Sequence, residues 1–146
     1  MIIVREFKQV GIIYHYTRYD SLLSILKDNA LLISNHNYIS FTRNSKSIKE
    51  RLKVQIVIDG DKLSNAYKIE PFNYFKSSNR EEREERVLTR KISNLANYIL
   101  EINIGFDEDT FFYQMGKQEI FNNYIEQVNK LKKRLKLKRG SVKWIK

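Results

Sequence analysis

The chain has 146 residues, of which 42% are hydrophobic and 12% aromatic, so it suits one folded domain over 1–146 and excludes a multidomain enzyme. It has no cysteine, only His15 and His36 as imidazoles, and apolar runs of a few residues, so we expect no disulfide, no metal site, no membrane span and a cytoplasmic location. The net charge of +10 points to a phosphate-bearing or otherwise acidic partner.

The first half of the chain predicts short strands, because β-branched and aromatic residues gather between polar turns. These strands are expected over residues 12–17, 31–33, 38–42 and 54–58. Asp20 is expected to cap a helix whose apolar residues recur at helical spacing and which ends near Asp28 and Asn29. A polar turn is expected at 35–37, and a short helical turn over 62–65.

In the second half, Pro71 disfavours a helix over 66–75, and the aromatic residues that follow it are expected in an ordered loop. Residues 77–86 have no apolar side chain, which predicts a solvated loop or helix end that leads into Val87. Alternation over 98–104 predicts another strand. The element order is therefore α+β.

The last predicted element is a long amphipathic helix over 118–139, with a basic tail to residue 146. Residues 130–146 carry nine Lys or Arg and no acid, whereas residues 1–129 sum to +1. The candidate nucleic-acid contacts are Lys132, Lys133, Arg134, Lys136, Lys138 and Arg139. Such a basic end can bind phosphates. A solvated helix end, whose lysines favour solubility and the helix dipole, is the alternative interpretation.

Polar side chains gather in three clusters at strand ends, and the first is residues 14–17. His15 lies there just before a helix N-terminus, a place that suits an anionic or ribose-bearing ligand, although a structural role for this histidine stays open. In the second cluster, Ser40 and Thr42 share one face, and Arg43 offers a planar fork suited to a diphosphate or a carboxylate. Pairing of Arg43 with the nearby Glu50 is the alternative.

The third cluster is the charged segment 81–88. A carboxylate at the start of a strand can hydrogen-bond a sugar 2-hydroxyl and stabilise an oxocarbenium-like transition state. The alternative is a self-paired surface segment, because residues 80–86 contain four acids and three arginines.

Taken in this order, the clusters resemble the ADP-ribosyltransferase fold, and in particular the DarT-type nucleic-acid transferases and related short phage and bacterial proteins. The similar segments are YHYT at 14–17 with SLLSIL at 21–26 and ALLIS at 30–34, ISFTRN at 39–44, and EERVL at 84–88 followed by YILEI at 98–102. The resemblance covers about 12–104 and leaves the final helix and basic tail outside it.

The resemblance implies mixed or antiparallel sheets with flanking helices, and a cleft that binds NAD as substrate without a metal. The residues that it places around NAD are His15, Tyr16, Thr17, Ser40, Phe41, Thr42 and Arg43. Glu84 or Glu85 would activate the 2-hydroxyl of the transferred ribose. One step along a strand turns a side chain to the opposite face, and we favour Glu84, which shares a face with Arg86, while keeping Glu85 beside it.

These features favour an NAD-dependent mono-ADP-ribosyltransferase that modifies a nucleic acid or a nucleic-acid-bound protein, in phage–host conflict or a toxin system. Ile, Lys and Asn make up a third of the chain, a bias typical of AT-rich coding sequence in a bacterium or one of its phages. A non-catalytic accessory protein that binds nucleic acid or a protein through the basic helix is the rival hypothesis. A ribonuclease with His15 or His36 as general base is a third.

Overall fold

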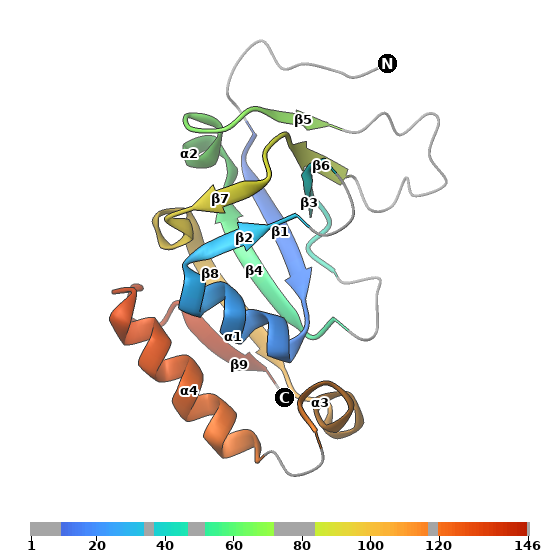
Figure 1. Ribbon diagram of the computed structural model, residues 1–146, viewed down its shortest axis with the longest axis vertical. Coiled ribbons are helices and arrows are strands. Elements are labelled where there is room, and N and C mark those ends of the chain that lie inside the picture. Colours follow the sequence, from blue (N-terminus) through green and yellow to red (C-terminus); the bar gives the residue numbers. More distant parts are fainter. Residues whose placement is uncertain (1–9, 34–36, 47–51, 72–83, 117–119, 146) are drawn as a thin grey trace.

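The computed structural model describes residues 10–33, 37–46, 52–71, 84–116 and 120–145 (Figure 1). The strands are β1 (Ile12–Thr17), β2 (Ala30–Leu32), β3 (Ile39–Thr42), β4 (Val54–Asp59), β5 (Ile69–Pro71), β6 (Glu84–Val87), β7 (Lys91–Ser93), β8 (Ile99–Gly105) and β9 (Val142–Ile145). The helices are α1 (Tyr19–Asp28), α2 (Gly60–Ser64), α3 (Glu108–Met115) and α4 (Phe121–Arg134), with a short 3-10 helix at Leu95–Asn97.

A seven-stranded sheet in the order β5-β6-β3-β1-β4-β8-β9 forms the centre of the fold, and β2 pairs with β7 in a second, two-stranded sheet. Neighbouring strands are antiparallel except β8 and β9, which are parallel. The predicted α+β class is therefore confirmed, and the large sheet is mixed, in agreement with the mixed or antiparallel sheets that the resemblance implies.

The inner face of the large sheet, which we define as the face that carries Ile13, Ile56 and Ile102, is packed into the core. All three of these side chains are fully buried. Figure 1 shows α1 crossing this face, and Leu22 and Leu26 of α1 belong to the same core. Burial of each such side chain contributes about 1.5–3 kcal/mol. The β1–α1 segment is therefore held against the sheet by its apolar residues.

The C-terminal helix is part of this core. Tyr124, Val128 and Leu131 recur at helical spacing on the buried side of α4. Arg134 in its last turn donates hydrogen bonds to the carbonyls of Leu26 (3.2 Å) and Lys27 (2.7 Å). These carbonyls lie at the end of α1, where helices leave acceptors unpaired, so Arg134 caps α1 from a neighbouring helix.

Several predicted boundaries differ from the structure. The helix expected over 118–139 begins at Phe121 and ends at Arg134, and residues 142–145, expected in a basic tail, form β9 beside β8. Val142 and Trp144 pack against the core, and this packing favours a strand over a solvated tail. The strand β7 and the helix α3 were not predicted. None of the described helices is long and apolar enough to pass through a bilayer.

Two local predictions were also wrong. Arg18, not Asp20, occupies the N-cap of α1, and Asp20 lies in the first turn, where it accepts a 2.9 Å bond from Arg18 Nε. The second is the solvated segment expected to reach residue 86. Its end, from Glu84 onward, belongs to strand β6, since pairing with β3 and β5 places it inside the sheet. The aromatic run expected as a loop at 72–75 lies outside the described residues.

Candidate functional site

Three predicted site residues lie in one row across the inner face of the large sheet. Phe41 of β3 is directly opposite Glu85 of β6, and the His15 ring of β1 contacts the Phe41 ring edge-on, with 5.6 Å between centroids. Adjacent strands lie about 4.8 Å apart, so Glu85 and His15 are separated by about 10 Å of sheet. We call His15, Thr17, Phe41, Arg43 and Glu85 the inner cluster.

The acidic group of the inner cluster is Glu85. Its side chain is 1% exposed, although the sequence around it is charged. Its Oε2 accepts a hydrogen bond from Arg43 Nε at 3.2 Å, and the Arg43 side chain remains 31% exposed. A buried carboxylate requires such a partner, because an uncompensated charge is costly away from water. The local partner considered for Arg43, Glu50, lies outside the described residues.

His15 is held in a defined protonation state. Its Nδ1 lies 3.1 Å from the carbonyl oxygen of Ser40, and a carbonyl only accepts, so Nδ1 carries the proton. Burial lowers the pKa of His15 from its usual value, and the Ser40 hydrogen bond offsets part of this effect. The ring is therefore neutral near pH 7. Its Nε2 has a free lone pair that can accept a hydrogen bond from a hydroxyl group.

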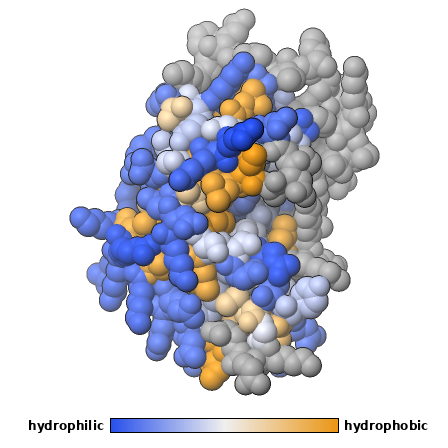
Figure 2. Space-filling view, in the orientation of Figure 1, coloured by the Kyte–Doolittle hydropathy of each residue, from blue (hydrophilic) through white to orange (hydrophobic). Residues whose placement is uncertain are grey.

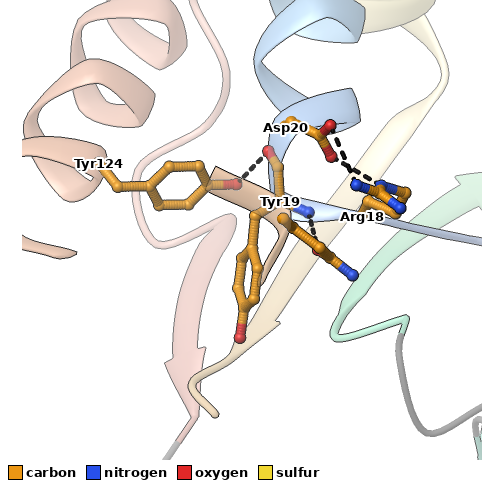
Figure 3. A network of polar contacts seen from close by, with 5 residues as sticks. Arg18, Tyr19, Asp20 and Tyr124 are labelled. Carbon is orange, nitrogen blue, oxygen red and sulfur yellow. Dashed lines mark hydrogen bonds and ion pairs between the residues drawn. The ribbon is translucent and has the colours of Figure 1, made fainter. Parts of the chain in front are cut away.

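The backbone that follows Thr17 is held by hydrogen bonds to side chains of α3 and α4. Thr17 is buried at the end of β1, and the next turn begins α1. Tyr19 N donates to Gln114 Oε1 (2.9 Å), and Tyr124 OH donates to the Tyr19 carbonyl (2.8 Å), as Figure 3 shows for Tyr124. These bonds join the β1–α1 turn to α3 and α4, so the position of the inner cluster depends on the C-terminal half of the chain.

The other predicted residues lie on the opposite, outer face, and we call Tyr16, Ser40, Thr42, Glu84 and Arg86 the outer cluster. Ser40 Oγ donates to Glu84 Oε2, and Arg86 Nε donates to Glu84 Oε1 at 2.9 Å. Arg86 also lies over the Tyr38 ring, 4.1 Å from its centroid. The expected association of Glu84 with Arg86 is present. It holds Glu84 on the face turned away from His15.

Sequence reasoning missed Gln55 and Asn103, which join the outer cluster at Tyr16. Gln55 Nε2 donates to Tyr16 OH, and Asn103 Nδ2 donates to Gln55 Oε1, both at 2.8 Å. Gln55 is the single polar residue of VQIVI, and this isolated position was the available signal, whereas Asn103 shares ILEINI with Glu101 and gave no such signal. Burial raises the pKa of Tyr16, so its hydroxyl keeps its proton at neutral pH.

The structure does not bring the predicted basic residues to the inner cluster. Lys132 and Lys133 lie in the last turn of α4, and Lys136, Lys138 and Arg139 follow it, mostly exposed. Trp144 of β9 contacts Tyr124 of α4, so this helix lies at the β8–β9 edge, and Figure 2 shows hydrophilic side chains over it. Three strand intervals, about 14 Å, separate β3 from β8.

In the described part of the chain, no three His, Asp or Glu side chains are grouped so that they could hold a metal ion. The absence of a metal therefore stays a prediction. The inner cluster carries one guanidinium, one carboxylate, one imidazole and one hydroxyl. This set suits a ligand that carries both phosphates and ribose hydroxyls.

The sequence matches no model of a protein family and no curated protein. The fold, in contrast, resembles solved structures of DarT from Thermus sp. 2.9. The complex with carba-NAD+ has a TM-score of 0.57 at 11% identity, covering 96% of this chain and 97% of that one. The complexes with NAD+ and with ADP-ribosylated ssDNA have TM-scores of 0.54 and 0.56 at 13% identity, covering 97% and 99% of this chain, and 97% and 98% of those chains.

The chain therefore has a DarT-like ADP-ribosyltransferase fold, as the resemblance in the sequence implied. The structural likeness extends over nearly the whole chain, whereas the resemblance recognised in the sequence ended at about residue 104. The final helix and β9 lie in the part of the chain that this likeness covers.

Proposed function

We propose that the protein is an NAD-dependent ADP-ribosyltransferase that acts on DNA. The single observation that carries the proposal is the row formed by His15, Phe41 and Glu85 on the inner face of a DarT-like fold. The similar DarT structures contain NAD+ in one case and ADP-ribosylated ssDNA in another. A covalent adduct obstructs the copying of a DNA strand, which suits a toxin or a phage–host conflict inside a bacterial cell.

Glu85 is the proposed catalytic residue, because it shares the inner face with His15 and Glu84 does not. Its carboxylate accepts a hydrogen bond from the 2-hydroxyl of the nicotinamide ribose. The bond from ribose C1 to the nicotinamide nitrogen breaks, and its electron pair leaves with nicotinamide. The negative charge of Glu85 stabilises the positive charge that develops on the sugar. A nucleophile of the DNA then attacks C1 and releases its proton to water.

The remaining inner residues hold the substrate. His15 Nε2 accepts a hydrogen bond from a ribose hydroxyl, since Nδ1–H is used by Ser40. Arg43 turns its fork to the diphosphate, which competes with Glu85 for the guanidinium. Thr17 and Phe41 border the ribose. Among the seven residues expected around NAD, Tyr16, Ser40 and Thr42 lie on the outer face, and we propose no substrate contact for them.

The basic residues at the end of α4 are proposed to bind the DNA backbone away from the reaction site. Lys132, Lys133, Lys136, Lys138 and Arg139 retain this role from the sequence prediction, and Arg134 is engaged with the end of α1. Because they lie at the other side of the sheet, they would anchor a long strand and contribute little to a short one.

The test is incubation of the purified protein with NAD and single-stranded DNA, followed by mass spectrometry of free nicotinamide and of the DNA. We expect nicotinamide release with a matching mass gain on DNA. Both should be lost in Glu85→Gln and retained in Glu84→Gln, the matched control on the adjacent position. DNA binding with no NAD consumption would overturn the proposal and support the non-catalytic accessory protein.

A further inference from the structure

A chain of polar side chains crosses three strands on the outer face, behind the inner cluster. Tyr16 of β1 is directly opposite Gln55 of β4, which is directly opposite Asn103 of β8. Gln55 Nε2 donates to Tyr16 OH, and Gln55 Oε1 accepts from Asn103 Nδ2, both at 2.8 Å. We call these three residues the polar ladder. Both amide side chains are partly buried and hydrogen-bonded, as polar groups withdrawn from water usually are.

The free end of the polar ladder holds the backbone that follows β3. Tyr16 OH donates to the carbonyl of Asn44, and Gln55 Nε2 donates to the carbonyl of Ser45, each at 2.8 Å. Both amide hydrogens of Gln55 are thereby used, and the Tyr16 hydroxyl both donates and accepts. Two consecutive carbonyls of a loop are therefore fixed by side chains from two different strands.

Side chains within residues 42–46 also form hydrogen bonds to the backbone of the same segment. Asn44 N donates to Thr42 Oγ1, and Lys46 N donates to Asn44 Oδ1, both at 3.0 Å. Turns of this kind depend on Thr and Asn side chains that bond to the backbone two residues away. Residues 42–46 thus have a defined conformation, with the polar ladder as their external support.

Arg43 lies inside this segment, between Thr42 and the first carbonyl that the polar ladder holds. Its guanidinium reaches the inner face, where Nε donates to Glu85. Backbone fixed from the outer face therefore sets the position of a charged group on the inner face. A group that is ordered before its ligand arrives loses less conformational entropy on binding.

We propose that Tyr16 and Gln55 are positioning residues for Arg43: they hold its backbone so that the guanidinium is presented to the NAD diphosphate. The inference rests on the proposed function, and it assigns Tyr16 a role different from the NAD contact expected from the sequence. It predicts weaker NAD binding when the ladder is broken. The turnover number should change little, because Glu85 and His15 remain in place.

The experiment measures NAD affinity by titration calorimetry, and kcat from nicotinamide release, for Tyr16→Phe and Gln55→Met. Each variant keeps the approximate shape of the side chain and removes the bond to residue 44 or 45, together with the Tyr16–Gln55 bond and, in Gln55→Met, the bond from Asn103. Loss of one neutral hydrogen bond corresponds to an about 3- to 10-fold rise in the dissociation constant. Tyr113→Phe, at a side chain 73% exposed on α3, is the matched control and should bind NAD as the wild type does.

A double-mutant cycle with Arg43→Gln separates positioning from general loosening of the fold. The Gln amide can still donate to Glu85, so the buried carboxylate keeps a partner. If the ladder acts through Arg43, Tyr16→Phe has no further effect on NAD affinity in the Arg43→Gln background. Equal effects in both backgrounds, or wild-type affinity in both ladder variants, would overturn the inference while NAD turnover by the wild type still stands. A wild type that neither binds nor consumes NAD overturns the proposed function and this inference with it.

Discussion

Arg43 and Glu85 form an ion pair, 3.2 Å from Nε to Oε2, between positions that are diagonal to each other on paired strands. Phe41 is directly opposite Glu85, and Arg43 is two residues further along the same face. The exposures of 31% and 1% make Arg43 the accessible partner and Glu85 the enclosed one. An anionic ligand that approaches this face therefore meets the guanidinium first.

Glu85→Gln should lower the rate of nicotinamide release at least about 100-fold, because the amide cannot neutralise positive charge on the ribose. The substitution keeps the shape of a buried side chain, so the melting temperature should stay close to that of the wild type. Glu84→Gln should keep more than half of the activity, since Glu84 bonds to Ser40 and Arg86 on the outer face. A reversed result would assign the reaction to Glu84.

The neutral His15 should make stability depend on pH. Its folded pKa lies below the unfolded value of about 6.5, so between the two the unfolded chain binds more protons. The contribution of His15 to the free energy of unfolding should have its full value above about pH 6.5. It should fall as the pH decreases from there, by at most about 1.4 kcal/mol per pH unit. Urea unfolding at several pH values should show this slope, and His15→Gln should lack it. Identical slopes in the two proteins would contradict a buried, neutral His15.

Tyr124→Phe should destabilise the fold by about 1 kcal/mol. The hydroxyl that it removes donates to the Tyr19 carbonyl at 2.8 Å, and the Tyr124 side chain is fully buried. Urea unfolding measures the difference. The exposed Tyr113→Phe is the control, expected to stay within about 0.5 kcal/mol of the wild type. Equal stability of the wild type and the two variants would contradict a stabilising role for the hydrogen bond between Tyr124 and Tyr19.

Gly60→Ala should cost about 1–3 kcal/mol of stability. A Cβ at this position would lie 2.4 Å from the Gly11 carbonyl oxygen and 2.6 Å from Val10 Cγ1, and backbone cannot move aside as a flexible side chain can. Gly105→Ala is the matched control, since its nearest neighbour would be the Lys53 carbonyl oxygen at 3.7 Å, an ordinary contact. Thermal unfolding of the two variants should differ clearly, and equal melting temperatures would contradict the close approach at Gly60.

Replacing four of the exposed basic residues, Lys133, Lys136, Lys138 and Arg139, by Gln should weaken binding to long single-stranded DNA. For each of these side chains that binds a phosphate, its replacement should lower the slope of log K against log salt by about 0.7. Nicotinamide release without DNA should not change. Deletion of 130–146 is unsuitable, because it would also remove β9 and the buried Leu131. An unchanged slope would contradict DNA binding by these residues and support the alternative interpretation of a solvated helix end.

Much of the secondary structure was predictable because its signals are local. The β-branched and aromatic residues over 12–17, the alternation over 98–104, and the apolar spacing after Asp20 depend only on neighbours along the chain, and β1, β8 and α1 formed there. The predicted end of the last helix at residue 139 was wrong. The helix α4 ends at Arg134, Leu135 is its C-cap, and Lys136 has a φ of 57°, as Val142 and Trp144 turn back to the sheet.

The amino-acid sequence determined the residue types of the site and their order along the chain: a histidine near the end of one strand, an arginine just after another, and paired glutamates at the start of a third. Only the tertiary structure decided which of them meet. Pairing of β1 with β3 and of β3 with β6 places Glu85 on the face of His15, and turns Glu84 and Tyr16 to the other face. The physical reason is that side chains alternate along a strand, whereas the register between strands depends on contacts among residues far apart in the chain.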